Sequence, residues 1–411
     1  MENDAVIRAA EGVLTQRYGG TQRLGDVVRL NGSGVAGVYR AKVAPNPFLQ
    51  HRTVVVKHAP ETGDALDDAA FFREVVAYQF TTSLRSGVRP GPVLLAYDTQ
   101  QRMLIISDAG DGDTLASMLE RADDAQYVQI LRNLGTALGR MHAGTADREP
   151  AFNVLFTRMM RSRTGAERVQ QLRDKLLAHR IRLGMSMLER AGMTVPTEVS
   201  LTAANLQSRL LRGGVRAFTP FDLSPDNIIY TEHGTQFLDY EWAGFRDASF
   251  DVAFVAAGFP LYLSPQSYNE DAVQAFIDAW LQEVSSTWPL LRHDDTLQAR
   301  ITGSMIGWAL SSLSVLNPVA LSEVAANDVE LAAEFEQAGI ELEADGEEAD
   351  FGTAGHILRA PADRPFNESE LMVRADLRET FLALANYAGT GRDTAYLVIA
   401  DFARRVAQRL Q

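Results

Sequence analysis

The spacing of apolar and polar positions predicts that the first part of the chain is rich in strands. Alternating or β-branched runs are separated by turn residues, and two segments with helical spacing interrupt them. The predicted elements, in order, are a helix at 4–17, two strands within 27–43, a strand at 53–56, a helix at 67–84, and strands at 93–97 and 103–106. This pattern indicates a small sheet-rich lobe with one main helix.

After Asp108 the apolar positions recur at helical spacing. The predicted helices include 125–142, much of 164–191, 269–284, 371–387 and 394–410. One short island departs from this pattern, since 227–230 and 236–239 are predicted to form a β-hairpin around Glu232-His233-Gly234. The sequence therefore predicts an α+β protein of two lobes, with a β-rich lobe at 1–107 and a large, mostly helical lobe at 108–411.

Composition supports two lobes and limits the classes of molecule that the protein is expected to bind. The chain has 411 residues, and a single hydrophobic core stops growing at about 250–300 residues. The absence of cysteine excludes disulfides and thiolate metal sites and suits a cytoplasmic protein. A net charge of −14 makes nucleic acid an unfavourable partner, because no basic stripe offsets the repulsion between phosphates and the chain. The same charge would attract a cationic substrate.

Two segments bear on membranes and on disorder. Residues 301–321 are uncharged and long enough to cross a membrane, but their polar residues and Pro318 favour a buried core helix that ends near this proline. The first residues lack the basic and apolar runs of a signal peptide, so we expect no membrane association and a cytoplasmic location. Residues 322–350 are acidic and lack Lys and Arg, which predicts a solvated or disordered segment, with binding of a cationic ligand as the alternative.

A glycine motif lies between the first two predicted strands. Gly32, Ser33, Gly34 and Gly37 fit the pattern G-x-G-x-x-G, in which glycine lets backbone N–H groups approach phosphate oxygens closely. In a dinucleotide-binding fold the motif would open a helix, whereas here a strand follows it. The motif therefore favours the loop that covers the phosphates of ATP in kinases, and an ordinary glycine-rich hairpin is the alternative.

A lysine and a glutamate follow the motif. Lys57 ends the β-branched run at 53–56, from which it could reach the α- and β-phosphates of ATP. Glu74 lies on the next predicted helix among apolar neighbours, where its carboxylate could pair with Lys57 and hold it extended. The alternatives are an edge-strand lysine that prevents aggregation and a solvent-facing glutamate.

The strongest constellation lies in the helical part. Asp222 and Asn227 belong to one predicted loop, and Asp239 lies across the predicted hairpin from Asn227. Phosphoryl transfer needs a carboxylate that orients the attacking hydroxyl and oxygen ligands that hold Mg²⁺ on the phosphates. Each residue alone is typical of a turn or a helix cap, but the three in this order, with Lys57 and Glu74 upstream, indicate a kinase.

These segments resemble a known family, the small-molecule kinases of the aminoglycoside phosphotransferase and choline kinase group. That family carries a catalytic loop H-x-D-L-x-x-x-N and then a metal-binding D-[YFW]-E. The segments of this chain that look like its motifs are Asp222-Leu223 with Asn227, Asp239-Tyr240-Glu241, Phe250-Asp251 and the helix end at Leu138 to Gly144 with His142. The resemblance runs from about Gly32 to Ala253 and is specific for the fold and the reaction, but poor on the substrate.

The resemblance implies a protein-kinase-like fold and a phosphotransferase that uses ATP and Mg²⁺. Asp222 would be the general base, Asn227 and Asp239 would bind the metal, and Asp251 would brace the catalytic loop. The implied nucleotide-binding residues are Gly32, Ser33, Gly34, Gly37, Lys57 and Glu74, with the backbone near Ser107 and Ala109 binding adenine. One departure is Pro220-Phe221, which stands where the family has a histidine-containing pair. It motivates a second hypothesis, a nucleotide-binding pseudokinase or regulatory scaffold without turnover.

Two further hypotheses fit the sequence less well. A protein kinase would carry an A-P-E-like segment after Asp239, and none is seen. A dinucleotide-dependent dehydrogenase would place an acidic residue where Lys57 stands.

The expected acceptor is a small alcohol resembling an aminoglycoside or choline. A cationic acceptor fits the acidic net charge of the chain, although sugars and other alcohols stay open. Its site is expected to be lined by residues 145–219 and the C-terminal helices, and the sequence does not predict the oligomeric state.

Overall fold

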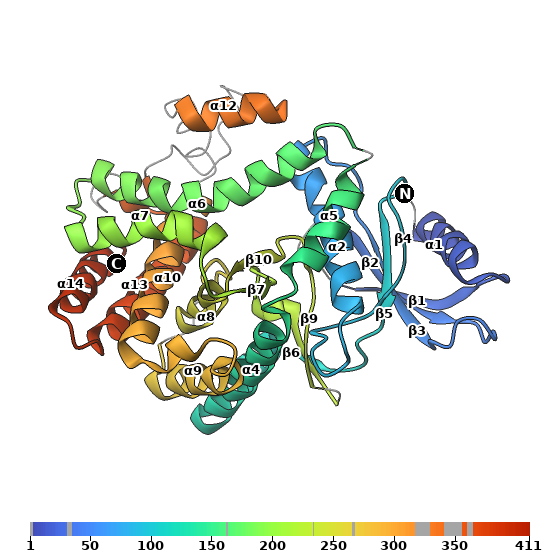
Figure 1. The fold of residues 1–411 in the computed structure, drawn as a ribbon, viewed down its shortest axis with the longest axis horizontal. Helices are drawn as coiled ribbons and strands as arrows, with labels where there is room; N and C mark the ends of the chain where they lie inside the picture. Colours follow the sequence, from blue (N-terminus) through green and yellow to red (C-terminus); the bar gives the residue numbers. More distant parts are fainter. Residues whose placement is uncertain are drawn as a thin grey trace.

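A computed structural model describes residues 3–30, 35–161, 163–232, 234–264, 268–316, 329–340, 356–359 and 365–411. A sheet-rich lobe lies beside a larger helical body, and the two termini lie at opposite ends of the molecule (Figure 1). The predicted α+β fold class, with a small β-rich N-terminal lobe and a mostly helical remainder, is confirmed. The boundary proposed at residue 107 stays a prediction.

The N-terminal lobe is built on one antiparallel sheet with the strand order β1-β2-β3-β5-β4. Its strands are β1 (Leu24–Leu30), β2 (Gly37–Val43), β3 (Thr53–His58), β4 (Leu94–Asp98) and β5 (Met103–Ser107). Side chains alternate between the two faces of a strand, so Val54 and Val56 are buried on one face and Lys57 belongs to the other. Because β3 pairs with both β2 and β5, Lys57 is not on an edge strand.

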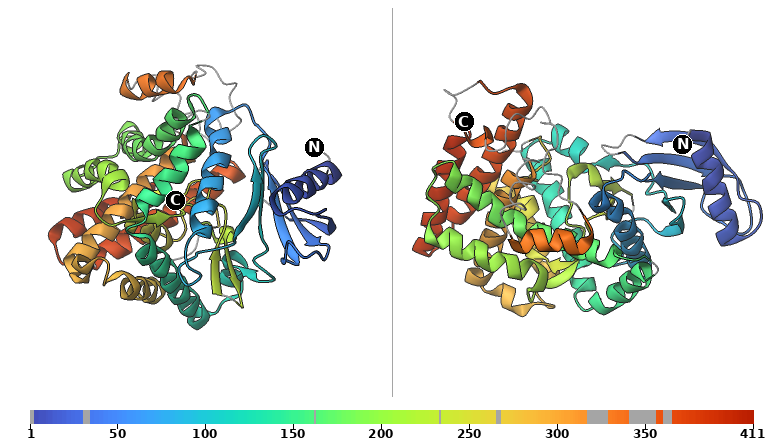
Figure 2. Two further views of the ribbon diagram at one scale, coloured as in Figure 1. Left: turned by 45° about the vertical axis from the view of Figure 1, so that its right-hand side comes forward. Right: turned by 90° about the horizontal axis from the view of Figure 1, so that it is seen from above.

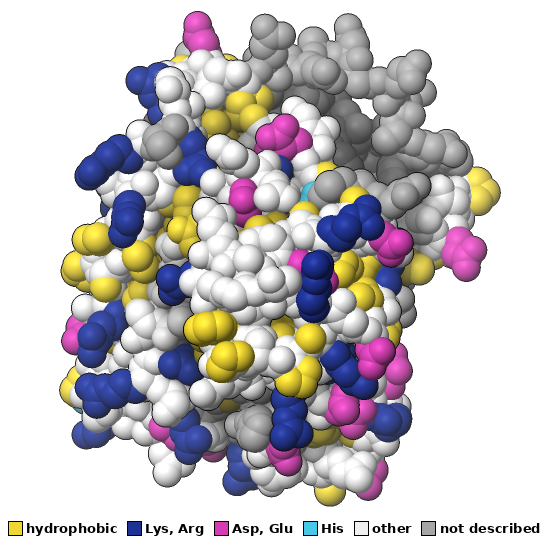
Figure 3. Space-filling model, turned by 90° about the vertical axis from the view of Figure 1, so that its right-hand side faces the viewer, with side chains coloured by type: hydrophobic (Ala, Val, Ile, Leu, Met, Phe, Trp, Pro, Cys, Tyr) yellow, Lys and Arg dark blue, Asp and Glu magenta, His cyan; other side chains and the backbone are white. Residues whose placement is uncertain are grey.

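Helix α1 (Asn3–Tyr18) covers the outer face of this sheet. Val6, Ala10 and Leu14 recur at helical spacing and form a small core with β-strand residues such as Val54 and Val56. The sheet and α1 project from the helical body in both views of Figure 2. On the molecular face at this end, Lys and Arg side chains are scattered among acidic, polar and apolar ones (Figure 3).

Helix α2 (Ala65–Thr82) connects the sheet to the helical body. It begins after Asp64, whose carboxylate accepts the backbone N–H groups of Leu66 and Asp67. Its buried Phe71 and Val75 belong to the larger core, which also contains the C-terminal helices, and the helix packs against α5 and α6. The helix that carries Glu74 is therefore held mainly by the helical body.

The helical body contains the remaining long elements. Its helices are α3 (Leu115–Arg121), α4 (Asp124–Thr145), α5 (Glu149–Met160), α6 (Ala166–Arg190), α7 (Thr197–Arg212), α8 (Ser249–Ala256), α9 (Glu270–Val284), α10 (Asp294–Val315), α12 (Val329–Ala338), α13 (Glu368–Gly389) and α14 (Thr394–Arg409), with short 3₁₀ helices η1 (Pro225–Asn227), η2 (Pro289–Arg292) and η3 (His356–Leu358). Five of these helices were not predicted from the sequence: α3, α5, α7, α8 and α12.

Short strands in the helical body position the loop that carries Asp222. Strands β8 (Ile228–Thr231) and β9 (Gly234–Phe237) form the predicted hairpin, and β6 (Asp113–Thr114) pairs with β8. The expectation that Asn227 and Asp239 lie on opposite strands is wrong, because Asn227 ends η1 and Asp239 follows β9. They flank the base of the hairpin, where the Leu238 N–H donates to the Asn227 carbonyl at 2.8 Å. A second pair of strands, β7 (Arg216–Thr219) and β10 (Gly244–Asp247), was not predicted.

Two segments questioned in the sequence have clear outcomes. Helix α10 is buried from Ile301 to Ser314, which confirms a core helix, although Pro318 lies outside the described residues. No helix within the described ranges is long and apolar enough to cross a membrane. Of the acidic segment 322–350, residues 329–340 are described and include α12, whose Leu331 and Phe335 are buried against α6. The expectation of a solvated or disordered segment is wrong for this part.

Helices α6 and α10 approach closely because Gly184 has no side chain. A Cβ atom at this position would lie 1.8 Å from the Leu310 carbonyl oxygen, a backbone atom. We expect Gly184→Ala to force the helices apart and to lower the free energy of unfolding by about 1–3 kcal/mol or more. The matched control is Gly12→Ala in α1, where nothing lies within 4 Å and alanine should stabilise the helix slightly. Thermal unfolding of both variants checks this, and an unchanged midpoint for Gly184→Ala would contradict it.

Candidate active site

Lys57 is the cation at the centre of the candidate site. Its Nζ lies 2.9 Å from a carboxylate oxygen of Glu74 and 2.9 Å from Asp239 Oδ1. Burial alone would lower the pKa of Lys57, but the two neighbouring carboxylates outweigh it and raise that pKa. The pair predicted between Lys57 and Glu74 is therefore present, and the same lysine joins the sheet, α2 and the segment after β9.

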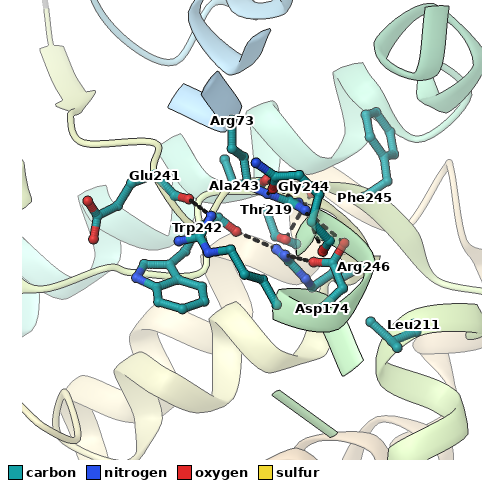
Figure 4. Close-up of polar contacts among 12 residues, drawn as sticks. Arg73, Asp174, Leu211, Thr219, Glu241, Trp242, Ala243, Gly244, Phe245 and Arg246 are labelled. Carbon is teal, nitrogen blue, oxygen red and sulfur yellow. Dashed lines mark hydrogen bonds and ion pairs between the residues drawn. The ribbon is translucent and has the colours of Figure 1, made fainter. Parts of the chain in front are cut away.

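Arg73, the residue before Glu74, points into the helical body, where a buried network holds it (Figure 4). Its guanidinium lies 2.9 Å from an Asp174 oxygen and donates to the Ala243 carbonyl at 3.2 Å. Arg246 contacts the other oxygen of Asp174 at 2.6 Å. Successive residues of a helix point about 100° apart, so Arg73 anchors α2 while Glu74 faces Lys57.

Asp222 lies in the loop between β7 and η1. Its Oδ1 accepts the Ser224 N–H at 3.0 Å, and its Oδ2 accepts from Asn227 Nδ2 at 3.2 Å. These bonds fix the direction of the carboxylate. Burial raises the pKa of Asp222, and the two hydrogen bonds oppose that effect only in part.

The loop before Asp222 is held by aromatic packing. Phe221 has φ +70°, a backbone region that costs a non-glycine residue about 1–3 kcal/mol and that clusters at functional sites. Its ring centroid lies 5.0 Å from that of Trp308, and the Arg246 guanidinium lies 4.8 Å from the Phe221 ring. At Pro220-Phe221, where the resemblance implies a histidine-containing pair, the loop of this chain is thus supported by aromatic packing.

A buried triad lies behind the loop. His142 Nε2 is 3.2 Å from Asp251 Oδ2, and the Trp280 indole N–H donates to His142 Nδ1 at 3.0 Å. Because Nδ1 accepts from Trp280, a neutral His142 carries its proton on Nε2 and donates it to Asp251. Burial raises the pKa of Asp251, whereas His142 and the nearby backbone of Phe221 lower it. Asp251 is thus placed between the α4 helix end and the catalytic loop.

Asn227 and Asp239 offer oxygen atoms beside Asp222. The Asn227 amide nitrogen donates to Asp222, which leaves its carbonyl oxygen for another partner. The Asp239 side chain is 36% exposed, and its backbone has φ +56°, a second unusual conformation. Among the described residues no group of three His, Cys, Asp or Glu could hold a metal alone. This donor set fits Mg²⁺, which binds one or two protein oxygens and completes its shell with phosphate and water.

The predicted nucleotide contacts are placed only in part. Gly32, Ser33 and Gly34 lie outside the described residues, and Gly37 begins β2. Ser107 ends β5 and donates its N–H to the Val93 carbonyl at 2.8 Å, and its part in binding adenine stays a prediction. The Ala109 carbonyl accepts from Gln236 Nε2 at 3.4 Å, which ties this segment to β9, and a contact of Ala109 with adenine stays a prediction.

A cavity of about 270 Å³ borders Asp222 on the side of the helical body. Its walls come from α6, α7, α8, α10, the catalytic loop and the segment after α8. The lining overlaps the expected acceptor site through α6 and α7, which lie within 145–219, whereas α8 and α10 were not expected there and α13 and α14 do not contribute to the described lining.

Sequence analysis missed the Arg73–Asp174–Arg246 network. Its residues come from α2, α6 and β10, so no local motif contains them. The available signal was the position of Arg73 beside Phe72 in a mostly apolar run. A charged residue in such a run is often buried with a partner, and both Arg73 and Glu74 are buried here.

A sequence model of the phosphotransferase enzyme family matches residues 38–293, which is more than half of the chain and includes Lys57, Asp222 and Asp239. The chain therefore belongs to this family of small-molecule phosphotransferases, and the resemblance seen in its motifs is confirmed. None of the curated proteins compared with the sequence matches it significantly.

Solved structures also resemble the chain along most of its length. They include a choline kinase from Cryptosporidium parvum (TM-score 0.43, 13% identity, covering 82% of this chain and 98% of that one). A choline kinase from Streptococcus pneumoniae has a TM-score of 0.42 at 14% identity, and the match covers 80% of this chain and 98% of that one. An aminoglycoside phosphotransferase in complex with gentamicin has a TM-score of 0.41 at 12% identity and covers 80% and 95%. The assignment to the family rests on the sequence match.

Proposed function

We propose that this protein is an ATP- and Mg²⁺-dependent phosphotransferase that phosphorylates a hydroxyl group of a small molecule. The observation that carries the proposal is the position of Asp222. Its carboxylate borders the cavity and, through Asn227, adjoins the segment that holds the Lys57–Asp239 pair. Phosphoryl transfer needs a carboxylate between a phosphate-binding cation and an acceptor site.

In this mechanism the acceptor hydroxyl lies in the cavity and donates a hydrogen bond to Asp222. The hydroxyl oxygen attacks the γ-phosphorus of ATP and forms the new P–O bond. The bond from the γ-phosphorus to the β,γ-bridging oxygen breaks, and its electron pair leaves with ADP. The hydroxyl proton passes to Asp222, whose pKa is raised by burial. Lys57, held by Glu74, would bind the α- and β-phosphates.

The metal would be held by Asn227 and Asp239. Bound there, Mg²⁺ would neutralise negative charge on the phosphates. In this proposal residues 1–107 supply most of the nucleotide site, and residues 108–411 supply the catalytic and acceptor-binding groups.

Two measurements made together test the proposal. Thermal unfolding is followed during titration with Mg-ATP, and ADP release is screened with small alcohols of cationic, neutral and anionic character. We expect stabilisation by Mg-ATP and turnover with one class of acceptor. Stabilisation without any turnover would favour the nucleotide-binding scaffold motivated by Pro220-Phe221. A protein that Mg-ATP does not stabilise would rule out both.

The pH dependence of kcat/KM should show an acidic limb that belongs to Asp222. Burial raises its pKa, so the folded protein protonates this carboxyl at a higher pH than an ordinary Asp, whose pKa is about 3.9. As pH falls through the raised pKa, Asp222 becomes neutral and can no longer accept the hydroxyl proton. We therefore expect kcat/KM to fall tenfold per pH unit on the acidic side of this raised pKa. The assignment would be contradicted if kcat/KM stayed constant as the pH fell to the ordinary Asp pKa of about 3.9. Circular dichroism must show that the protein remains folded at that pH.

A further inference from the structure

The lining of the cavity beside Asp222 is largely aromatic. Six aromatic side chains contribute to it: Phe221, Trp242, Phe250, Phe254, Tyr262 and Trp308. Among the described lining residues only Asp222 carries a carboxylate, and Arg180 is the other charged residue. The volume of about 270 Å³ lies at the small end of the range for ligand pockets. The cavity therefore suits a compact acceptor with an apolar body.

Arg180 is a cation for which the described residues provide no counterion. It lies on α6 between the lining residues Leu177 and Ile181, and its side chain is partly buried. No hydrogen bond or ion pair joins its guanidinium to another residue within the described ranges, and burial lowers its pKa. Guanidinium nevertheless stays charged in proteins, and a buried charge is costly unless it is paired. An anionic group in the cavity would supply the missing partner.

Three rings of the lining already face arginines from outside the cavity. The Arg173 guanidinium lies 4.2 Å from the Trp242 ring, and Arg246 lies 4.8 Å from the Phe221 ring. A third arginine, Arg209, lies 5.9 Å from the Phe250 ring. A ring attracts a cation through its negative face, but here guanidinium groups already use these rings. A cationic ligand would therefore meet like charge behind the aromatic walls.

Carboxylates lie behind these walls together with the arginines. Asp174 is shared by Arg246 and Arg73, and Asp247 is shared by Arg209 and Arg300. Each of these two carboxylates faces two guanidinium groups, while Glu241 faces Arg173 and Asp251 faces Arg246. Figure 4 shows Asp174 with Arg73 and Arg246. The charges behind the walls are therefore close to balanced, and Arg180 is the cation of the lining that the described residues leave unpaired.

We infer that the acceptor is an apolar hydroxy acid, a compact and preferably aromatic alcohol with a carboxylate that pairs with Arg180. Its hydroxyl lies at Asp222, and its apolar body lies between the aromatic walls. This inference rests on the proposed phosphotransferase function, because it names the substrate class of the same site. It departs from the cationic acceptor expected from the overall charge.

Three matched probes test the inference: para-hydroxymethylbenzoate, its neutral amide and the cationic aminomethyl analogue. They share one ring and one hydroxymethyl group and differ in the charge opposite the hydroxyl. Calorimetry measures the Kd of each probe in the presence of Mg-ADP, which does not require turnover. A charge-assisted, partly buried contact with Arg180 should make the benzoate bind at least about tenfold tighter than the amide. The aminomethyl analogue should bind most weakly.

Variants of α6 separate the role of Arg180 from general electrostatics. Arg180→Met should remove the preference for the benzoate, and Arg180→Glu should shift the preference to the aminomethyl analogue. Arg190→Met, an exposed arginine at the end of the same helix, is the matched control and should keep the wild-type order. Equal affinities in the wild type, preference for the cation, or a benzoate preference that survives Arg180→Met would overturn the inference.

Failure of the inference can be told apart from failure of the proposed function. Stabilisation by Mg-ATP and turnover of a neutral or cationic alcohol would leave the phosphotransferase intact while overturning the hydroxy acid. Loss of Mg-ATP binding itself would instead remove the proposed function on which the inference rests.

Discussion

Replacing Asp222 by asparagine is expected to lower the rate of phosphoryl transfer by roughly 10²–10⁴-fold. Asparagine has nearly the same shape, and its one carbonyl oxygen can still accept the Ser224 N–H, so the loop should keep its conformation although the hydrogen bond from Asn227 Nδ2 is lost. It cannot take the hydroxyl proton, and it lacks the charge that orients the acceptor. Single-turnover measurement of ADP formation with saturating Mg-ATP isolates this loss from nucleotide binding.

The control for Asp222 lies in the same loop. Asp226 is exposed at η1, so Asp226→Asn removes a carboxylate of the same kind without touching the cavity. We expect this variant to retain wild-type turnover, and we expect both variants to be stabilised by Mg-ATP as the wild type is. Full activity of Asp222→Asn would disprove the mechanism, because no other described carboxylate lines the cavity.

Replacing Asp239 by alanine is expected to abolish transfer by a different route. The substitution removes an oxygen ligand and also one of the two carboxylates that hold Lys57. The wild type should bind Mg-ATP more tightly than metal-free ATP, since the metal links the phosphates to Asp239. In Asp239→Ala this difference should disappear, together with the transfer activity.

The readout for Asp239 is the ratio of the two nucleotide affinities, measured by titration with and without excess chelator. This ratio reports on the metal and does not depend on the acceptor. A variant that keeps the wild-type preference for Mg-ATP would show that the metal is held elsewhere. Asp222→Asn should keep this preference, so the two variants distinguish a base from a metal ligand.

Much of the candidate site could be predicted from the sequence because its groups lie in short segments. Asp222 and Asn227 share one loop, and Asp239 follows the adjoining hairpin, so local spacing brings them together. The pairing of Lys57 with Glu74 was also accessible, since a strand and the helix after it commonly pack together. The outcome confirms the contact between Lys57 and Glu74, while the catalytic roles stay proposals.

Other parts of the site depend on contacts between distant segments. Arg73 and Asp174 are separated by 101 residues, and neither belongs to a motif. The lack of a described partner for Arg180 depends on how α6 packs against α10, which periodicity does not specify. For the proposed hydroxy acid, net charge would be a poor guide, because a sum over the whole surface does not report the few charges around one cavity.

The anchoring of α2 by Arg73 determines which parts of the protein can move together. Glu74 stays with the helical body, whereas Lys57 belongs to the sheet. Any separation of the lobes that admits or releases a nucleotide would therefore stretch the Lys57–Glu74 ion pair. The distance between Lys57 and Glu74 would then report the degree of opening. Labels placed on the sheet and on α2 would follow this distance in real time. Loosening α2 should then change the dissociation rate of ADP more than the chemical step.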